Sequence, residues 1–291
     1  MVWLIGCRGM LGTEISLLLD NQNVPYMGTD KEVDITNAAE LDKFAEGKSI
    51  TWLVNCAAYT AVDKAEDDVE SCKLLNTTGA ANIALCAKKI NAKLIHLSTD
   101  YVFDGKGSVP YKEDEKPNPI GVYGLTKRDG EIAVLENNSN SYIIRIAWLY
   151  GKHGNNFVHT MIKLMNERDE LKIVNDQYGS PTWSYDLTKV ILRFVKESDS
   201  GKNIPFGVYH FTNEGKTTWC DFAKEIYKQG RELGLIKNRC NILPCTSAEF
   251  PAKVKRPMYS VLDKEKIKNT LGIEIPNWDK GLKEFLTSCV N

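Results

Sequence analysis

The amino-acid pattern predicts an α/β fold, a doubly wound parallel sheet with a smaller C-terminal α/β lobe. Over the first half of the chain, short apolar runs alternate with helical patterns of about ten residues or more. These runs are almost continuously apolar, as expected for strands buried on both faces. A glycine-spaced turn separates the first run from the first helical pattern. The 291 residues suffice for one large domain or two modest ones.

Each element of the first half follows from a local pattern. Residues 2–5 are apolar and meet Gly6 at once, so they predict a strand that ends in a turn. Apolar residues at helical spacing then predict a helix over 11–19. The same reasoning predicts strands over 24–28, 51–55, 93–98 and 142–149, and helices over 37–44, 64–89 (with a break near Gly79) and 123–135.

The carboxyl ends of the predicted strands carry a notable set of residues. In open α/β sheets, ligands bind outside these ends. The residues that fall there are Gly6, Asn55, Ser98 and Trp148. The strand pattern thus places a ligand site at this edge of the sheet.

The pattern loosens in the second half of the chain. Helices are predicted over 157–165, 187–195 and 219–233, a strand over 207–212, and an irregular segment over 240–260. We therefore expect residues 1–150 to form an NAD(P)-binding domain. Residues 151–291 would form mainly a substrate-binding lobe, with some of its helices packing back on the sheet.

Composition and charge exclude several classes of protein. The chain has 37 Lys plus Arg against 38 Asp plus Glu, which gives no electrostatic footprint for nucleic acid or a membrane surface. The eight cysteines show no metal-ligand spacing, and the four histidines do not cluster beside them. No stretch resembles a signal peptide or a membrane span. We expect a cytoplasmic chain with reduced thiols and no protein-bound metal.

The glycines at positions 6, 9 and 12 predict a phosphate-binding turn. Phosphates need close backbone approach and free N–H donors at a helix start, and glycine permits both. The spacing is GxxGxxG rather than the common GxGxxG. The alternative interpretation of these glycines is a tight turn with no ligand. As a dinucleotide site, this turn would hold NADPH or NADH through Gly6, Arg8, Gly9, Met10, Leu11 and Gly12.

The adenosine end of that cofactor has several candidate ligands. Asp30 follows the second strand, 18 residues after Gly12, where an acid binds the ribose 2′-OH and disfavours a 2′-phosphate. Its neighbour Lys31, or Arg8 in the turn, would do the reverse. Asp34 and Ile35 are further candidates, and a solvated turn is the alternative. The preference between NAD and NADP stays open.

Tyr123 and Lys127 are the strongest candidates for acid–base chemistry. Their i, i+4 spacing puts them on one face of a helix. A phenol has a pKa of about 10, too high for easy proton transfer at neutral pH. An ammonium about 4 Å away would contribute about 4 kcal/mol at an effective dielectric of about 20, roughly 3 pKa units. We therefore expect a phenol whose pKa is lowered towards neutrality.

Two hydroxyl residues, Ser98 and Thr99, end the fourth strand. One could donate a hydrogen bond to a substrate carbonyl and stabilise developing oxyanion charge. We expect the other to bond to the backbone, and Asp100 to cap a loop.

Longer motifs resemble the extended branch of the short-chain dehydrogenase/reductase superfamily, and within it the dTDP-4-dehydrorhamnose reductase family. They span nearly the whole chain and keep the order of the family. The resembling stretches are residues 55–63 (NCAAYTAVD), 98–105 (STDYVFDG), 122–127 (VYGLTK), 145–151 (RIAWLYG), 176–182 (DQYGSPT) and 256–260 (RPMYS).

The resemblance implies a Rossmann domain, a nucleotide-sugar substrate and reduction of its C4 ketone in rhamnose biosynthesis. Thr99 would polarise the ketone, Tyr123 would donate the proton, and Lys127 would tune the tyrosine and hold the nicotinamide ribose. Asn55, Ala57 and Ala58 would follow the cofactor along the third strand. The expected substrate contacts are Ser98, Tyr101, Trp148 and Arg256.

Some features depart from the family or leave alternatives open. Some members dimerise through carboxylates that hold magnesium; Glu14 matches one such position, but the C-terminal half offers no secure partners. We expect a monomer or a homodimer. A non-catalytic branch serves as a regulatory subunit of methionine adenosyltransferase, and other relatives are nucleotide-sugar epimerases or dehydratases. The dehydratases usually place Asp-Glu after the threonine, whereas Asp100-Tyr101 follows Thr99 here.

Overall fold

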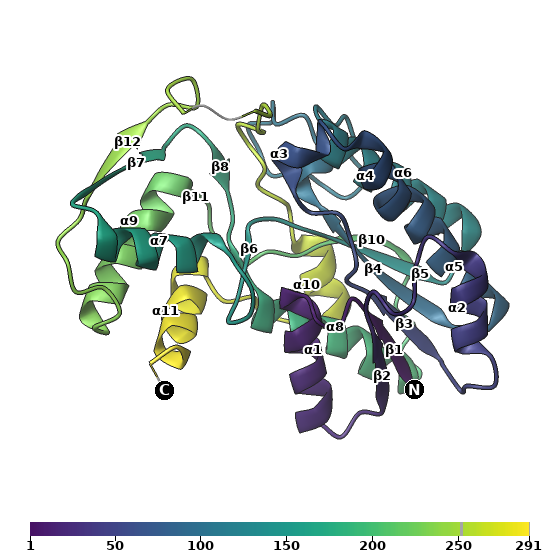
Figure 1. Cartoon of the computed structure of the whole chain (residues 1–291). Coiled ribbons are helices and arrows are strands. Elements are labelled where there is room, and N and C mark those ends of the chain that lie inside the picture. Colours follow the sequence, from purple (N-terminus) through teal and green to yellow (C-terminus); the bar gives the residue numbers. More distant parts are fainter. Residues whose placement is uncertain (251–252, 291) are drawn as a thin grey trace.

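The computed structural model describes residues 1–250 and 253–290 and has two lobes, one built on the central sheet and a smaller one (Figure 1). The sheet has six strands in the order β10-β5-β4-β3-β1-β2, and every neighbouring pair is parallel. The expected doubly wound α/β class is confirmed. Across the described residues, no helix combines the length and apolar character needed to cross a membrane.

The strands of this sheet lie close to their predicted positions. Consecutive apolar residues point alternately to the two faces, so each strand is buried on both sides. The chain order reverses between β1 and β3, and the carboxyl ends of these two strands flank the position where such sheets bind ligands. The strand bounds are β1 Val2–Ile5, β2 Tyr26–Thr29, β3 Trp52–Asn55, β4 Lys93–Thr99, β5 Ser141–Ile146 and β10 Gly207–His210.

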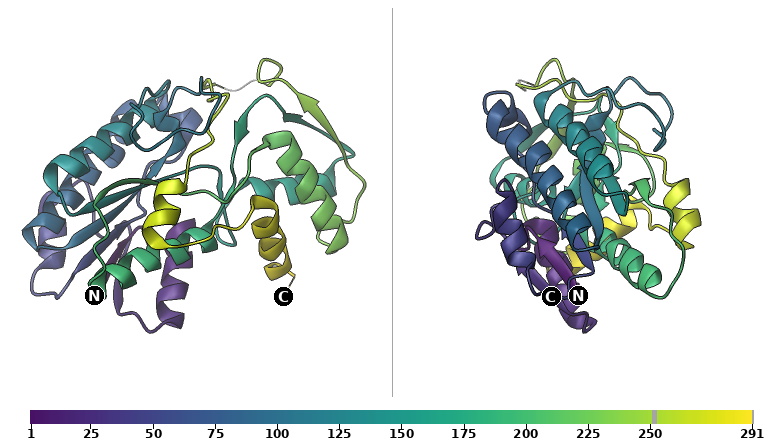
Figure 2. Two further views of the ribbon diagram at one scale, coloured as in Figure 1. Left: turned by 180° about the vertical axis from the view of Figure 1, so that it is seen from behind. Right: turned by 90° about the vertical axis from the view of Figure 1, so that its right-hand side faces the viewer.

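Helices cover both faces of the sheet. One face packs against α2 (Ala38–Ala45), α5 (Ala80–Lys89) and α6 (Val122–Asn137). The other packs against α1 (Met10–Asn21), α8 (Ser184–Asp199) and α10 (Glu265–Leu271). Figure 2 shows α10, in yellow, lying against this second face. The chain therefore returns from its second half to the sheet with two helices and also with strand β10.

The segment 64–89 is not one helix. It divides into α3 (Val62–Ala65), α4 (Val69–Lys73), a π-helical stretch over Leu74–Gly79, and α5. A Cβ at Gly79 would lie 2.8 Å from the Ile35 side chain, so the absence of a side chain lets this stretch approach the segment after β2. Gly79 has helical dihedrals (φ −60°, ψ −41°), and the chain stays helical through the π-helical stretch into α5, so the predicted break near Gly79 is wrong. The interruption lies instead between α3 and α4.

The smaller lobe has its own apolar core, formed by α7 (Phe157–Glu167), α9 (Trp219–Glu232), α11 (Trp278–Ser288) and short strands. β7 (Glu170–Val174) pairs in parallel with β12 (Asn241–Cys245). The expectation of an irregular segment over 240–260 is therefore wrong for residues 241–245, while residues 251–252 lie outside the described chain. Four two-residue strands form two further pairs, β6 (Leu149–Tyr150) with β9 (Thr182–Trp183) and β8 (Tyr178–Gly179) with β11 (Thr217–Thr218), and a 3-10 turn over Asp100–Val102 follows β4.

Candidate active site

A cavity of about 840 Å³ lies at the carboxyl ends of β1, β3 and β4. It brings together residues from the glycine turn, the segment after β2, the end of β4 and the start of α6. Three predicted site residues, Arg8, Asn55 and Arg256, lie outside its lining. The predicted residues that line it are Gly6, Gly9, Met10, Leu11, Gly12, Asp30, Asp34, Ile35, Ala57, Ala58, Ser98, Thr99, Tyr101, Tyr123, Lys127 and Trp148.

The glycine turn has the geometry of an anion cradle. Gly6 has φ of +79°, in the left-handed region, and a Cβ there would lie 2.8 Å from the Ala57 nitrogen. At the N-cap of α1, Gly9 has no side chain to offer, so in the described chain no side chain caps the first-turn amides. Met10, Leu11 and Gly12 in that turn line the cavity. Uncapped N–H donors and the positive end of the helix dipole suit a dinucleotide diphosphate.

The segment after β2 supplies an acidic rim beside this cradle. Asp30 lines the cavity, and its Oδ2 accepts a hydrogen bond from the Arg8 backbone N–H at 3.2 Å. The Arg8 guanidinium is largely exposed and forms ion pairs with Asp30 and Glu32. Asp34 also lines the cavity, but its Oδ1 already accepts from the Thr36 N–H and hydroxyl. Acidic and basic groups thus meet where an adenosine ribose would lie. An acid there favours NAD and a base favours NADP, so the sequence pattern did not decide between the two cofactors.

Asn55 supports the cavity wall and does not reach the cavity. It is 1% exposed; its side-chain N–H donates to His96 Nδ1 at 2.9 Å, and its Oδ1 accepts from the Ala57 N–H at 3.0 Å. We therefore correct its expected role from a cofactor contact to a group that orients Ala57. This role depends on the pairing of β3 with β4, which places Asn55 beside His96. The pattern of one strand does not show which strand lies next to it.

The acid–base candidates come together because α6 lies against the turn that follows β4. A Cβ at Gly124 would lie 2.1 Å from the Tyr101 carbonyl oxygen, so only glycine permits this approach. The rings of Tyr101 and Tyr123 meet edge to face with centroids 5.5 Å apart. Thr99, Tyr123 and Lys127 all line the cavity, so the structure places the predicted trio in one site.

The expected acidification of the phenol is not observed. Burial raises the pKa of Tyr123 above its ordinary value, although a hydrogen bond with Thr99 opposes the rise. Burial lowers the pKa of Lys127 to about 8, against the opposing charge of Glu131. The ammonium donates to the Leu97 carbonyl at 2.6 Å. Tyr123 is therefore a protonated acid at neutral pH, and the prediction of a phenol near neutrality is wrong because burial has the largest effect on its pKa and the nearby Asp100 raises it further.

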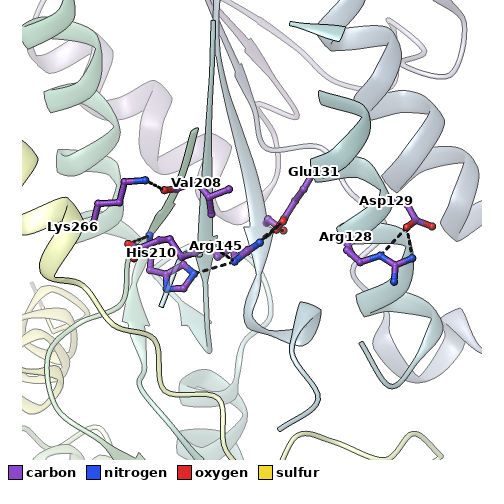
Figure 3. Close-up of polar contacts among 9 residues, drawn as sticks. Arg128, Asp129, Glu131, Arg145, Val208, His210 and Lys266 are labelled. Carbon is purple, nitrogen blue, oxygen red and sulfur yellow. Dashed lines mark hydrogen bonds and ion pairs between the residues drawn. The ribbon is translucent and has the colours of Figure 1, made fainter. Parts of the chain in front are cut away.

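Ser98 lines the cavity, but its hydroxyl is bonded to a side chain of α6. Its hydroxyl donates to Glu131 Oε1, and Glu131 makes a two-pronged ion pair with Arg145. Figure 3 shows Glu131, which projects from α6, and Arg145 pointing toward one another. We expected one of the two hydroxyls to bond to the backbone, and the structure shows that this one is Thr99, which accepts from the Tyr101 N–H and donates to Asp100 Oδ1. The Ser98 hydroxyl bonds to a side chain instead, so a substrate contact by this hydroxyl is not supported.

Asp100 lines the cavity and is not the loop cap that we expected, because Thr99 caps the turn. It is 2% exposed, and burial raises its pKa from 3.8 to about 6. Its Oδ2 finds no hydrogen-bond partner within the described residues. A raised carboxyl pKa means that ionisation opposes folding: this penalty is absent below pH 3.8 and complete above about pH 6.

Substituting Asp100→Asn is expected to stabilise the protein increasingly as the pH rises. The full penalty is up to about 3 kcal/mol, and about 1 kcal/mol of it should appear between about pH 5 and about pH 7.5. Urea unfolding of both proteins at these two pH values measures the change.

Asp104→Asn is the matched control, because backbone and side-chain hydrogen bonds lower the pKa of Asp104. Its ionisation favours folding, and this contribution is already complete above its ordinary pKa of 3.8, so Asp104→Asn should lose the same stability at about pH 5 and at about pH 7.5. If Asp104→Asn gained stability over this range as Asp100→Asn does, the burial argument for Asp100 would be untenable.

Trp148 forms an aromatic wall of the cavity and is not simply core. Its φ is +49°, an uncommon backbone state for a bulky residue and one that is often found at functional sites. Its ring stacks on Trp219, with centroids 3.6 Å apart and planes at 12°. A Cβ at Gly179 would lie 2.5 Å from the same ring. Sequence reasoning missed Trp219, whose only signal was an aromatic residue at the start of a helix. Trp183, by contrast, belongs to the apolar core of the smaller lobe.

Arg256 belongs to a second cavity of about 900 Å³ in the smaller lobe. Its guanidinium donates to Asp63 Oδ2 at 2.9 Å, and Lys253 pairs with Asp67. The basic segment 253–256 is therefore tied to the region of α3 by two ion pairs and is not a free exposed loop. The second cavity is lined by Trp219, Phe157, Lys172, Arg168, Lys255 and Arg256, among others.

Metal ligands do not gather in the part of the chain that the structure describes. No group of three or more His, Cys, Asp or Glu side chains there could hold an ion. Glu14 faces Ser184 of α8, whose hydroxyl donates to it at 3.3 Å.

Comparison with known proteins gives a consistent result. The sequence matches the family of the RmlD substrate binding domain over residues 1–291. A dTDP-4-dehydrorhamnose reductase of Aggregatibacter actinomycetemcomitans is 37% identical over 282 residues, which cover 96% of this chain and 96% of the relative.

Solved structures agree with the sequence matches. A dTDP-4-dehydrorhamnose reductase of Clostridium acetobutylicum superimposes with a TM-score of 0.91 at 40% identity and covers 99% of both chains. A dTDP-4-dehydrorhamnose reductase of Bacillus anthracis in complex with NADP has a TM-score of 0.92 at 36% identity, with 99% of this chain and 98% of that chain covered.

Proposed function

We propose that this chain, which belongs to the RmlD substrate binding domain family, reduces the C4 ketone of dTDP-4-dehydro-β-L-rhamnose to dTDP-β-L-rhamnose with NADPH or NADH. One observation carries the proposal. A single cavity joins an uncapped, glycine-lined helix start to a threonine, a tyrosine and a lysine suited to carbonyl chemistry. A purely structural or regulatory protein would not need both halves of that cavity.

The residues of the cavity fit a nicotinamide dinucleotide. Neither Gly6 nor Gly12 has room for a Cβ, so the turn stays close-packed, and the first-turn amides of α1 are available to a diphosphate. Asp30 lies where the adenosine ribose is expected, and Ala57 and Ala58 form the wall beside the carboxyl end of β3. When bound, the reduced cofactor supplies a hydride to the ketone carbon.

The chain supplies the proton and the polar contacts for the ketone oxygen. Tyr123 is protonated at neutral pH and donates its phenolic proton as the oxygen gains charge. Thr99 holds its hydroxyl beside the phenol, and when substrate binds, its proton would turn from Asp100 Oδ1 to the ketone oxygen. Lys127, in its ammonium form, lies on the same face of α6 and provides positive charge to the reaction space.

The sugar lies against the aromatic side of the cavity in this proposal. Tyr101 and Trp148 line that side, and the Trp148–Trp219 stack continues towards the second cavity. Arg256 and the neighbouring lysines would face the negatively charged nucleotide part there. Residues 151–291 thus act mainly as the substrate lobe and residues 1–150 as the cofactor domain. We place the protein in the cytoplasm as a monomer or homodimer.

The decisive test follows the loss of reduced-nicotinamide absorbance with dTDP-4-dehydrorhamnose, using NADPH and NADH separately. Oxidation of either cofactor with formation of dTDP-rhamnose, identified by mass spectrometry and NMR, would support the proposal. No oxidation with either cofactor would leave the non-catalytic binding-module reading ahead. Reaction with other nucleotide 4-keto sugars, measured in parallel, would test the substrate assignment separately from the reductase assignment.

The titration of Lys127 predicts an alkaline limit to activity. Because burial lowers its pKa to about 8, the ammonium is lost as the pH rises through that value. We expect kcat/KM to fall about tenfold per pH unit above about pH 8, since this parameter reports the groups of the free enzyme. Initial rates at low substrate concentration, measured across neutral and alkaline pH, provide the test.

Lys127→Arg is the control for this limit. A guanidinium stays protonated over the whole range, so whatever activity that variant keeps should not fall near pH 8. An alkaline limit that survives unchanged in Lys127→Arg would assign it to another group.

A further inference from the structure

A buried charged cluster lies directly behind the reaction strand. Glu131, on α6, and Arg145, on β5, have side chains that are 4% and 3% exposed and an N–O separation of 2.7 Å. Arg145 also donates to His210 Nε2 at 3.3 Å, and its guanidinium lies 5.1 Å from the centre of the Phe103 ring. Figure 3 shows His210 on the side of Arg145 away from Glu131. None of these side chains lines the cavity, so the proposed reaction does not use them directly.

This cluster is joined to the reaction site through the end of β4. Three consecutive residues are involved: the Leu97 carbonyl accepts from Lys127, the Ser98 hydroxyl donates to Glu131, and the Thr99 hydroxyl faces Tyr123. Glu131 also follows Lys127 by one helical turn, on the same side of α6. The carboxylate is therefore linked to Lys127 along the helix and across to the strand.

Lys127 is 3% exposed and needs a compensating charge. The groups that face it within residues 1–250 and 253–290 are Glu131 of its own helix, Cys56 after β3, Cys72 of α4 and His96 of β4. Burial raises the pKa of Cys56 to about 12 and also raises that of Cys72, so both thiols are neutral at pH 7. Burial lowers the pKa of His96 well below its ordinary value, so this ring is neutral too. Of these groups, Glu131 is the anion.

We propose that Glu131, held in place by Arg145 and Ser98, is a positioning residue that keeps the buried Lys127 in its charged form. Arg145 fixes the Glu131 side chain through its two-pronged ion pair, and the Ser98 hydroxyl binds the same carboxyl group beside the end of β4. The negative charge of Glu131 compensates the positive charge of Lys127 only in part, because Arg145 binds both oxygens of the same carboxylate. The inference concerns the role of Lys127 and so rests on the proposed function, but its direct test does not require substrate.

The test measures the pH titration of the Lys127 ε-carbon NMR resonance in the protein without substrate, with the signal assigned by its loss in Lys127→Arg. In Glu131→Gln, the midpoint should move to lower pH by on the order of one unit, because the nearest anion is lost. In Arg145→Gln, it should move to higher pH, because Glu131 then faces Lys127 without a competing cation. Ser98→Ala keeps both charges and should move the midpoint least.

The opposite directions distinguish this role from a merely structural one. Both substitutions break the same buried pair and both should lower stability, so a structural role would leave the midpoint unmoved or move it the same way in both variants. Either result would overturn the inference. The alkaline limits of kcat/KM should follow the same order as the midpoints.

A variant that fails to fold does not end the test. The double substitution Glu131→Gln with Arg145→Gln removes both members of the buried ion pair together, and such replacements are often tolerated. Its midpoint should lie between those of the wild type and Glu131→Gln; a midpoint at or above the wild-type value would refute the role of Glu131. A further outcome is that the wild type oxidises neither cofactor while the Lys127 midpoints of the Glu131 and Arg145 variants still move in opposite directions. In that case the proposed function fails, and the coupling between Glu131 and Lys127 is still supported.

Discussion

Replacing Tyr123 by phenylalanine is expected to lower kcat by about 10²- to 10⁴-fold, the usual contribution of a positioned general acid. The change removes one oxygen and leaves the ring, so its edge-to-face contact with Tyr101 should persist. Because the phenol of Tyr123 stays protonated at neutral pH, its absence removes the proton donor and not merely a charge. Single-turnover oxidation of NADPH with the keto sugar gives the most direct measurement.

Two controls make this result specific. Dinucleotide binding, followed by fluorescence, should change little in Tyr123→Phe, because the diphosphate cradle lies on α1. Tyr111→Phe also removes one phenolic oxygen, from a buried tyrosine bonded to Asp104 and to the Gly107 N–H, outside the cavity. It should retain full turnover. If Tyr123→Phe kept full turnover as well, the assigned acid would be wrong.

Replacing Gly12 by alanine is expected to destabilise the fold by about 3 kcal/mol or more, at the upper end of overpacking effects. A Cβ at this position would lie 2.1 Å from the Gly6 carbonyl oxygen and 2.7 Å from the Cys7 Cα. Both are backbone atoms of the same turn, so relief requires α1 to move away from β1. The variant should also lose most of its dinucleotide affinity, since the same movement displaces the first-turn amides. Urea unfolding and a cofactor titration would measure the two effects.

Gly9→Ala is the matched control for stability. Gly9 has φ of −72°, an ordinary value, and a Cβ there would be 3.4 Å from its nearest neighbour, the same Gly6 oxygen. We expect Gly9→Ala to unfold within about 1 kcal/mol of the wild type. Equal losses in the two variants would show that crowding at Gly12 is not the cause.

The first half of the fold was predictable because its signals are local. An apolar run such as Val2–Ile5 that ends at glycine, followed by a helical apolar pattern, leaves few alternatives to a strand–turn–helix unit. Strands β7 and β12 escaped detection for the opposite reason. β12 contains Pro244, and each of the two strands is stabilised by pairing with a segment about 70 residues away in the chain.

The candidate site shows the same division. Spacing alone placed Tyr123 and Lys127 on one helix face, and both line the cavity. Spacing could not reveal that Ser98 turns to Glu131 or that Asn55 bonds to His96, because these partners arrive on other elements. The predicted direction of the Tyr123 pKa shift was also wrong. That direction is set by the burial of the phenol, which only the packed structure determines.

Local patterns in the chain were thus enough to establish the fold class, the diphosphate cradle and the reactive residue types. Short-range sterics and apolar periodicity act between near neighbours and can be read without knowing the fold. Packing of remote segments decided which hydroxyl faces the cavity, which amide is structural, and how Lys127 is charged. Hydrogen-bond partners and pKa values depend on burial and on charges brought from elsewhere, here by Glu131 and Arg145, and these exist only once the sheet and its helices have assembled.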